Sequence, residues 1–157
     1  MSIQKAYNEW SQTYDTDRNL TRDLDRQVML EMLANRHFNS ILEIGCGTGK
    51  NTSFLAQIGA HVHALDFSEG MIEKAREKVK AGNVRFSVAD LTQKWPCESQ
   101  SYDLIVCNLV LEHIEDLLFI FSEAFELWMQ EENFLSMSFI PSGSMKAKRP
   151  SLITAKA

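Results

Sequence analysis

Three glycines at alternate positions form the segment whose residue types point most clearly to chemistry. Gly45, Gly47 and Gly49 follow the apolar run 41–44, which carries one acid. Glycine is needed where a side chain would block a sharp turn or a ligand's approach to bare backbone, and amides at the start of a following helix would face that ligand. A dinucleotide fingerprint would have its third glycine at position 50, where the chain has Lys50. The spacing predicts a cofactor loop and disfavours a nicotinamide dinucleotide.

Further polar residues stand where successive apolar runs of strand length end. Glu43 lies inside the first run, Asp66 and Asn108 close later runs, and Asp90 follows another. Open α/β sheets bind ligands beyond the carboxyl ends of their strands, so we expect these side chains to line one site. Asp66 stands about 20 residues after the glycine loop, where a carboxylate can accept from both hydroxyls of a ribose. Asp90 is placed to accept from an adenine amine.

The elements that must position these residues alternate between strand-length runs and helical patterns, which is typical of βα units and a parallel sheet. Leu24, Val28 and Met32 share one face of the first predicted helix, and Ser68 is placed to cap a helix that ends at Gly82. The sequence predicts an α/β fold with about five strands. These strands are expected near residues 41–44, 62–65, 84–88, 103–108 and 133–140, and further helices at 50–58 and 114–128.

The composition fits one domain of 157 residues. No run is apolar over the ~18 residues of a membrane span, and the first residues lack the apolar run of a secretory signal. We therefore expect a cytoplasmic protein without a membrane partner. The net charge of −5 argues against nucleic acid as a partner. Cys46, Cys97 and Cys107 indicate reduced thiols, and His61 with His63 lacks a third ligand, so no metal is expected.

The motifs resemble those of the class I S-adenosylmethionine-dependent methyltransferases, from about residue 10 to residue 127. Each motif alone is weak evidence, but four in order at the right spacing are strong evidence. The resemblance implies a Rossmann-like parallel sheet flanked by helices, with S-adenosylmethionine as cofactor and S-adenosylhomocysteine as product. The four motifs correspond to residues 41–49, 64–71, 88–91, and 102–108 followed by 111–114.

The resemblance also implies which residues bind the adenosine part of the cofactor. Asp66 would take the ribose diol and Asp90 the adenine amine. The adenine ring would be flanked by Phe67, Met71 and Leu91.

At the methionine end, Glu43 would help to hold the ammonium group while loop amides take the carboxylate. Asn108 would lie near the transferred methyl group, and Tyr14 would close over this end of the cofactor. A structural carboxylate paired with loop amides is the alternative for Glu43, and core packing is the alternative for Tyr14. The loop residues implied in binding are Gly45, Cys46, Gly47 and Gly49.

The predicted reaction is an in-line displacement in which a small-molecule acceptor attacks the methyl group and the sulfonium leaves as a thioether. Aligning the two reactants supplies on the order of 7–11 kcal/mol by proximity alone. His113 follows the fourth strand and is the candidate general base, with a helix-start histidine satisfied by backbone as the alternative. Two other functions stay open: a protein that binds the cofactor without turnover, and a nicotinamide-dependent oxidoreductase.

The carboxyl end departs from the family pattern. Residues 128–132, Trp-Met-Gln-Glu-Glu, replace the usual Pro-Gly-Gly-like turn, and the family's final antiparallel hairpin is expected to be missing from a truncated or altered terminus. We expect residues 1–140 to form the S-adenosylmethionine-binding domain, with 1–36 as an amino-terminal helical lid and 141–157 as a disordered basic tail. Strand 133–140 would then have an uncovered edge, which predicts a homodimer through that edge, marginal stability or a rearranged carboxyl end.

Overall fold

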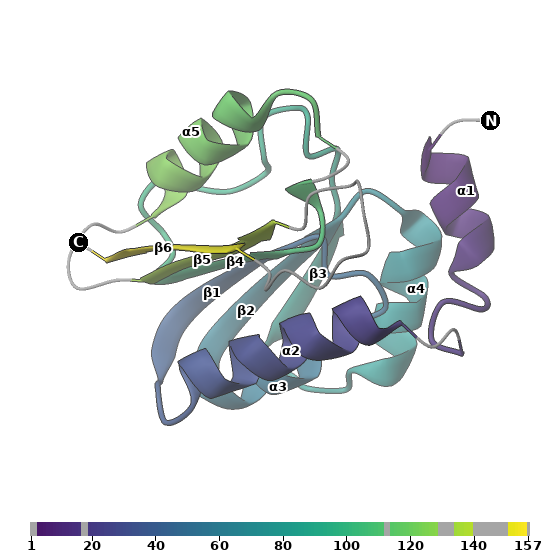
Figure 1. The fold of residues 1–157 in the computed structure, drawn as a ribbon, viewed down its shortest axis with the longest axis horizontal. Helices are drawn as coiled ribbons and strands as arrows, with labels where there is room; N and C mark the ends of the chain where they lie inside the picture. The colour runs from purple at the N-terminus through teal and green to yellow at the C-terminus, as the bar shows by residue number, and fades with distance from the viewer. Residues whose placement is uncertain (1–2, 17–18, 112–113, 129–133, 140–150, 157) are drawn as a thin grey trace.

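A six-stranded sheet with helices on both faces forms the centre of the molecule (Figure 1). The computed structural model describes residues 3–16, 19–111, 114–128, 134–139 and 151–156. The strands are β1 (Phe38–Ile44), β2 (Gly59–Asp66), β3 (Val84–Val88), β4 (Leu104–Asn108), β5 (Phe134–Phe139) and β6 (Ser151–Lys156). The helices are α1 (Ile3–Trp10), α2 (Leu20–Leu33), α3 (Thr52–Ile58), α4 (Glu69–Lys78) and α5 (Leu117–Leu127).

The strand order is β3-β2-β1-β4-β5-β6, and every neighbouring pair is parallel except β5 with β6. The order reverses direction between β1 and β4, the central pair of strands. In an open α/β sheet this reversal opens a crevice beyond the carboxyl ends of the strands. The predicted α/β class with a Rossmann-like sheet is confirmed.

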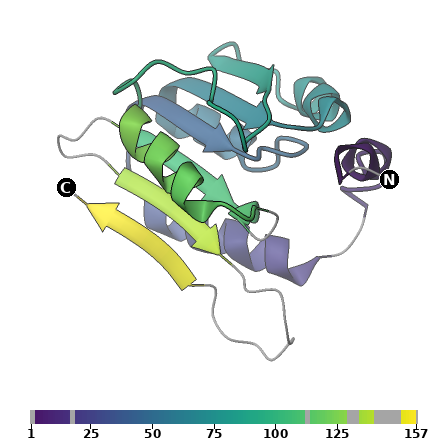
Figure 2. The same ribbon diagram turned by 90° about the horizontal axis from the view of Figure 1, so that it is seen from above.

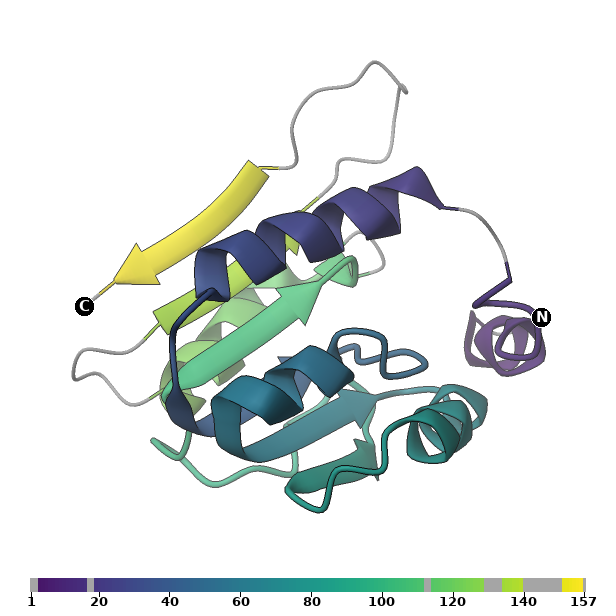
Figure 3. The same ribbon diagram turned by 90° about the horizontal axis from the view of Figure 1, so that it is seen from below.

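The two faces of the sheet are covered by different helices. Helix α5 lies over one face, as Figure 2 shows from above, and α2 and α3 cover the other, as Figure 3 shows from below. Side chains alternate along β1, so Ile41 packs in the cluster of α2 and α3 while Leu42 packs in the cluster of α5. Both faces of the central strands are therefore buried, which explains their continuous apolar runs.

Helix α2 buries a different face from the one predicted. Its buried residues are Asp25, Met29 and Leu33, whereas Leu24 is 47% exposed. Of the predicted stripe of Leu24, Val28 and Met32, Met32 packs at the edge of the core, but the stripe is not the most buried one, because adjacent stripes of this helix are both partly apolar. Packing of Met29 and Leu33 against the sheet decides between the stripes, and it carries Asp25 inward with them.

Helix α4 begins as predicted and ends earlier. The hydroxyl of Ser68 accepts a hydrogen bond from the Met71 amide at 3.2 Å, so the predicted cap is confirmed. The helix ends at Lys78, and Gly82 lies beyond it with open space where a Cβ would be. Gly82 was therefore wrongly predicted as the helix end.

The carboxyl end differs from the disordered tail that was expected over residues 141–157. Residues 151–156 form β6, which pairs antiparallel with β5 over its whole length. The edge of β5 that was expected to be uncovered is thus occupied by a segment of the tail that was expected to be disordered. A strand edge presents unpaired N–H and C=O groups, and an extended segment with β-branched residues satisfies them. No helix within the described ranges has the length and apolarity to cross a membrane.

Candidate functional site

A cavity of about 400 Å³ opens at the carboxyl ends of β1, β2 and β4. It receives side chains from the loops after these strands and after β3, from α2 and from the segment after α1. Of the predicted site residues, Gly49 is not part of its lining, and His113 lies outside the described residues. The others all line the cavity: Tyr14, Glu43, Gly45, Cys46, Gly47, Asp66, Phe67, Met71, Asp90, Leu91 and Asn108.

The three loop glycines serve different contacts. A Cβ on Gly45 would lie 2.0 Å from Cγ2 of Val110, and a Cβ on Gly49 would lie 2.9 Å from Cγ2 of Val79 behind the loop. A Cβ on Gly47 would meet nothing closer than the Tyr14 ring at 4.0 Å. Gly45 and Gly49 therefore allow close packing, and Gly47 alone leaves its backbone open toward the cavity.

The loop amides already have acceptors within the protein. The N–H groups of Gly45 and Cys46 both donate to the Leu65 carbonyl at 2.8 and 2.9 Å, and the N–H of Gly47 donates to Oδ2 of Asp66 at 2.9 Å. The adjacent parallel strand β2 ends beside the turn and offers these acceptors. Orphaned amides at a buried turn are satisfied by whatever acceptor is nearest. The expectation that these three amides take a ligand's carboxylate therefore does not fit the structure, and such a carboxylate needs other donors.

Asp66 fixes the glycine loop to the next helix. Its side chain is 5% exposed; Oδ2 accepts from the Gly47 amide and Oδ1 accepts from the Ser68 amide at 2.9 Å. Burial raises the pKa of Asp66, and hydrogen bonds from the amides of Ser68, Gly47 and Phe67 oppose that rise. Each carboxylate oxygen can accept two hydrogen bonds, so Asp66 retains capacity for a ligand that donates.

Glu43 is a buried acid at the floor of the cavity. It is 3% exposed, and its Oε2 accepts from the Thr52 hydroxyl at 2.5 Å. Its pKa is raised to about 8, chiefly by burial; the hydrogen bond from the Thr52 hydroxyl opposes this rise, and the nearby Asp66 carboxylate adds to it. The structural alternative for Glu43 predicted loop amides as its partners. The observed partner is instead the Thr52 hydroxyl on α3. At neutral pH Glu43 is mainly protonated, and an approaching cation would favour its ionised form.

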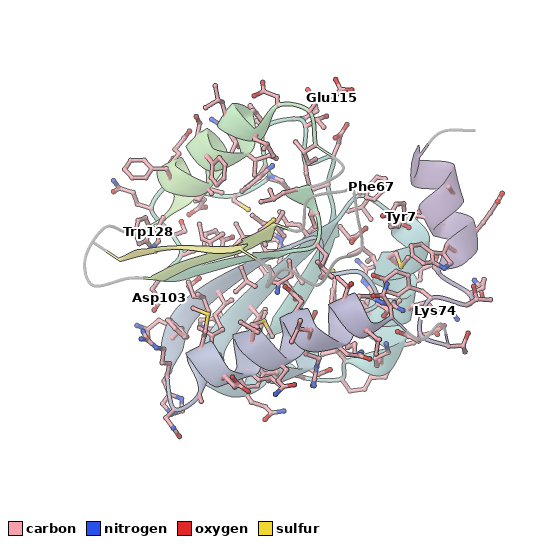
Figure 4. The ribbon with its side chains drawn as sticks, in the orientation of Figure 1. Tyr7, Phe67, Lys74, Asp103, Glu115 and Trp128 are labelled. Atoms are coloured by element: carbon pink, nitrogen blue, oxygen red, sulfur yellow. The ribbon has the colours of Figure 1, made fainter. Side chains whose placement is uncertain are left out.

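The loops after β2 and β3 form an apolar wall. Met71 and Leu91 are buried, and Phe67 is half-buried. Tyr7, which the sequence analysis missed, lies beside Phe67 in Figure 4, with ring centroids 5.2 Å apart at 66°. Asp90 is exposed at the rim, where its Oδ1 accepts from the Thr92 amide at 2.9 Å and the Thr92 hydroxyl at 2.7 Å.

The segment after α1 closes one side of the cavity. The Tyr14 ring contacts the Trp10 ring at 4.7 Å, and the Arg22 guanidinium carbon lies 4.2 Å from the centroid of the Tyr14 ring. Nη1 of Arg22 donates to the Tyr14 carbonyl at 2.8 Å. Asp15 accepts from the hydroxyl of Thr48 in the glycine loop at 2.8 Å, which ties this segment to the loop. Burial raises the pKa of Tyr14, and the hydrogen bond and charge of Arg22 lower it.

Helix α2 contributes residues that the sequence analysis missed. Arg22 and Asp25 line the cavity, and Nδ2 of Asn108 at the end of β4 donates to Oδ2 of Asp25 at 2.5 Å. Within the described part of the chain, neither Oδ1 of Asp25 nor Oδ1 of Asn108 has a hydrogen-bond partner. The sequence did carry a signal for Asp25. Asp25 stands four residues before Met29, in line with Met29 and Leu33, at a position where a buried helix face would normally have an apolar residue.

The histidine and cysteine candidates have structural surroundings. Nδ1 of His63 lies 3.0 Å from the Tyr102 hydroxyl and Nε2 lies 2.9 Å from the Ser87 hydroxyl, and burial lowers the pKa of His63 to about 4. Burial raises the pKa of Cys46, which remains a thiol. Across the described residues, no three potential ligands gather at one point to hold a metal ion.

Comparison with known proteins identifies the family. Residues 41–129 match a family model described as a methyltransferase domain. The chain belongs to the class I S-adenosylmethionine-dependent methyltransferases. The malonyl-[acyl-carrier protein] O-methyltransferase 2 of Coxiella burnetii is 31% identical over 141 residues, which cover 87% of this chain and 55% of the relative. The corresponding enzyme of Priestia megaterium is 34% identical over 120 residues, which cover 73% of this chain and 43% of the relative. This methyltransferase-family chain thus spans about half the length of the curated relatives it matches.

Solved structures of methyltransferases share the fold of this family member. A phosphoethanolamine N-methyltransferase 1 of Haemonchus contortus, in complex with phosphoethanolamine and S-adenosylhomocysteine, superposes with a TM-score of 0.73 at 21% identity, covering 94% of this chain and 35% of that one. A methyltransferase of Aquifex aeolicus superposes with a TM-score of 0.71 at 20% identity, covering 89% and 77%. At these identities the comparison supports the shared fold.

Proposed function

We propose that this protein transfers a methyl group from S-adenosylmethionine to a small-molecule acceptor. The observation that carries the proposal is the placement of Glu43, Asp66 and Asp90 around one cavity, each from a different βα unit. Their carboxyl groups suit a ligand that has a cationic methionine end, a ribose diol and an adenine amine. A pyrophosphate would be repelled by these acids, which speaks against the nicotinamide alternative.

In this proposal the adenosine part lies against the apolar wall. Phe67, Met71 and Leu91 contact the adenine ring, Asp90 accepts from its amine, and Asp66 accepts from the ribose hydroxyls. Asp66 is suited to this role because the amides of Gly47 and Ser68 hold its carboxylate in place before a ligand arrives. Preorganised acceptors lose little conformational entropy on binding.

The methionine part lies between the glycine loop, α2 and the segment after α1. Glu43 accepts from the ammonium group and releases its own proton as it does so, since a cation at that point lowers its raised pKa. The positive charge of Arg22 lines the same cavity and supplies the partner for the carboxylate that the engaged loop amides do not supply. Tyr14 closes over this end.

The bound cofactor supplies a methyl group that is already activated on a sulfonium. The protein's task is then to align the acceptor behind that methyl group and to exclude water, which is how proximity lowers the barrier. Asn108, at the carboxyl end of β4, lies at the place where the acceptor would approach. We propose His113 as a general base for acceptors that lose a proton, to be tested by the turnover of His113→Ala.

The acceptor proposed is a small molecule. The curated relatives act on malonyl-[acyl-carrier protein], whose malonyl group ends in a carboxylate, but the chain spans about half of their length. The acidic net charge of −5 disfavours nucleic acid. A homodimer through β5 loses its main argument because β6 covers that edge.

Calorimetry and a product assay test the proposal together. The protein should bind S-adenosylhomocysteine, show no thermal shift with NADH, and form S-adenosylhomocysteine from S-adenosylmethionine in the presence of an acceptor. Binding without product over a broad acceptor panel would favour the second candidate, a cofactor-binding protein without turnover, which the half-length match to its relatives makes worth testing. Stabilisation by NADH and not by S-adenosylhomocysteine would refute both.

A further inference from the structure

Two side chains that line the cavity each carry a buried acceptor oxygen without a donor in the described part of the chain. Oδ1 of Asp25 and Oδ1 of Asn108 both lack a hydrogen-bond partner among the described residues, and both side chains line the cavity. Asp25 is only 2% exposed. A buried polar atom without a partner costs about 1–3 kcal/mol, and more when it is charged. A ligand donor that reached either oxygen would remove this cost.

The orientation of the two side chains is fixed by the bond between them. Nδ2 of Asn108 donates to Oδ2 of Asp25 at 2.5 Å, so the other amide atom of Asn108 is an acceptor and not a donor. Asp25 is held by α2 and Asn108 by the end of β4, both regular elements of the core. The positions of both free oxygens are consequently fixed by the core.

The charge around the cavity favours a cation at this pair. The charged side chains that line the cavity in the described part of the chain are Asp25, Glu43, Asp66, Asp90, Arg22 and Lys50. Lys50 is paired with Asp23 at 2.7 Å, outside the lining. Even without Glu43, which is mainly protonated at neutral pH, the acids Asp25, Asp66 and Asp90 outnumber the bases, and a second carboxylate brought beside Asp25 would be repelled.

We propose that Asp25 and Asn108 bind the methyl acceptor and that this acceptor is a primary amine. The inference rests on the proposed function and deepens it. A primary amine carries two N–H donors, or three when protonated, and so offers the most donors to these acceptors. A hydroxyl carries one donor, and a carboxylate carries none and adds negative charge. The amine is thus preferred over the alcohol and the alcohol over the carboxylate.

For an amine held by Asp25, the transfer balances with Asp25, in place of His113, as the proton acceptor. The lone pair of the neutral amine nitrogen forms the new bond to the methyl carbon, and the electron pair of the carbon–sulfur bond stays on sulfur. One N–H proton, hydrogen-bonded to Oδ1 of Asp25, passes to that carboxylate. A sulfonium, an amine and a carboxylate become a thioether, an N-methylamine and a carboxylic acid, with a net charge of zero on both sides.

The cofactor's own ammonium group is the competing occupant of this pair. If Asp25 held the ammonium, Asp25→Asn would weaken S-adenosylhomocysteine binding strongly. If Asp25 holds the acceptor, that affinity stays within about twofold and the loss appears in turnover, because S-adenosylhomocysteine binding does not involve the acceptor subsite.

The experiment compares amines, alcohols and carboxylates built on the same carbon skeletons, from propyl to phenylethyl, with S-adenosylhomocysteine formation as the readout. Amines should react fastest, and Asp25→Asn should lower their kcat/KM by about 30-fold, as expected for loss of a hydrogen bond to a charged group. Asn108→Leu should cost about tenfold by the same reasoning. Glu31→Gln is the matched control, an acid-to-amide change on the exposed side of α2, and it should leave kcat/KM unchanged.

The outcomes separate this inference from the function on which it rests. A carboxylate that reacts as fast as the amines, no reaction with any amine, or a large loss of S-adenosylhomocysteine affinity in Asp25→Asn would overturn the amine subsite alone. Failure of the unmodified protein to bind S-adenosylhomocysteine would overturn the proposed function and this inference with it.

Discussion

The two sides of the cavity differ in how far the protein satisfies its own polar groups. On the glycine-loop side, Asp66 accepts from two backbone amides and Glu43 from the Thr52 hydroxyl. On the side of α2 and β4, Asp25 and Asn108 share one hydrogen bond, and each keeps an oxygen that has no partner among the residues the structure describes. The first side is built in the absence of a ligand, and the second is incomplete without one.

This difference separates side chains whose position is fixed by bonds within the protein from side chains that have an acceptor left for a ligand. A carboxylate held by backbone amides keeps its position and its remaining acceptor sites, which suits a ligand that is the same in every turnover. Buried oxygens without donors are costly and rare in native proteins, and a role in function is one of the reasons for which they are kept. We therefore assign the satisfied side to the common cofactor and the unsatisfied side to the specific acceptor.

The largest effect on the satisfied side is expected for Asp66→Ala. It removes both the proposed ribose contact and the bonds that fix the Gly47 and Ser68 amides, so S-adenosylhomocysteine affinity should fall at least about 100-fold. Asp90→Ala is the comparison, since Asp90 is exposed and bonds only to Thr92 among the described contacts, and it should cost about tenfold or less. Titration calorimetry measures both. Equal losses of affinity in the two variants would show that the bonds between Asp66 and the loop amides do not contribute to S-adenosylhomocysteine binding.

The next effect is a pH dependence of stability that comes from Glu43. Its pKa rises from 4.5 to about 8 on folding, so the folded state holds the proton more tightly, and the associated stability is complete below pH 4.5 and lost as pH rises through 8. Between pH 6 and 9 the unmodified protein should lose about 2–3 kcal/mol of unfolding free energy relative to Glu43→Gln, which has no proton to lose.

Urea unfolding at a series of pH values measures this difference. Glu73→Gln, on the exposed face of α4, is the control and should keep the pH profile of the unmodified protein. If the Glu43→Gln profile ran parallel to that of the unmodified protein, the buried acid would already be ionised at neutral pH, and the proton release proposed for cofactor binding would be wrong.

A smaller effect distinguishes two glycines of the same loop. Gly49→Ala places a Cβ 2.9 Å from Val79 and 3.2 Å from Ala75, so we expect a loss of about 2 kcal/mol in stability. Gly47→Ala meets no protein atom within that range but projects into the cavity at a φ of +54°, so we expect about 1 kcal/mol in stability and a further loss of S-adenosylhomocysteine affinity. Denaturant unfolding measures the stability of both variants, and calorimetry measures their affinity for S-adenosylhomocysteine. Equal losses of affinity in the two variants would contradict the different roles assigned to the two glycines.

The smallest effect is expected at Tyr14. Tyr14→Ala removes the ring contacts with Trp10 and Arg22, which are worth about 1 kcal/mol, and should weaken S-adenosylhomocysteine binding about fivefold. The dissociation rate measured by stopped flow should rise by a similar factor, since a closing segment acts on release. If the dissociation rate stayed unchanged while the free energy of unfolding fell, Tyr14 would be a core-packing residue and not part of a closing segment.

The sequence was informative wherever the signal is local. Apolar runs of strand length, the Ser68 cap and acids one βα unit apart were all readable without tertiary contacts, because they depend on the preferences of a few consecutive residues. The choice of face on α2 was not readable, since neighbouring stripes have similar apolar content and only the packing of Met29 and Leu33 against the sheet decides between them.

By itself, then, the sequence determined the βα alternation, the cofactor loop and the acids that follow its strands. Only the tertiary structure decided that the loop amides are already engaged, that β6 covers β5, and that Asp25 meets Asn108, 83 residues further along the chain. The reason is physical. A hydrogen bond between distant segments depends on how their elements pack, and that free energy is absent from any local pattern of residue types.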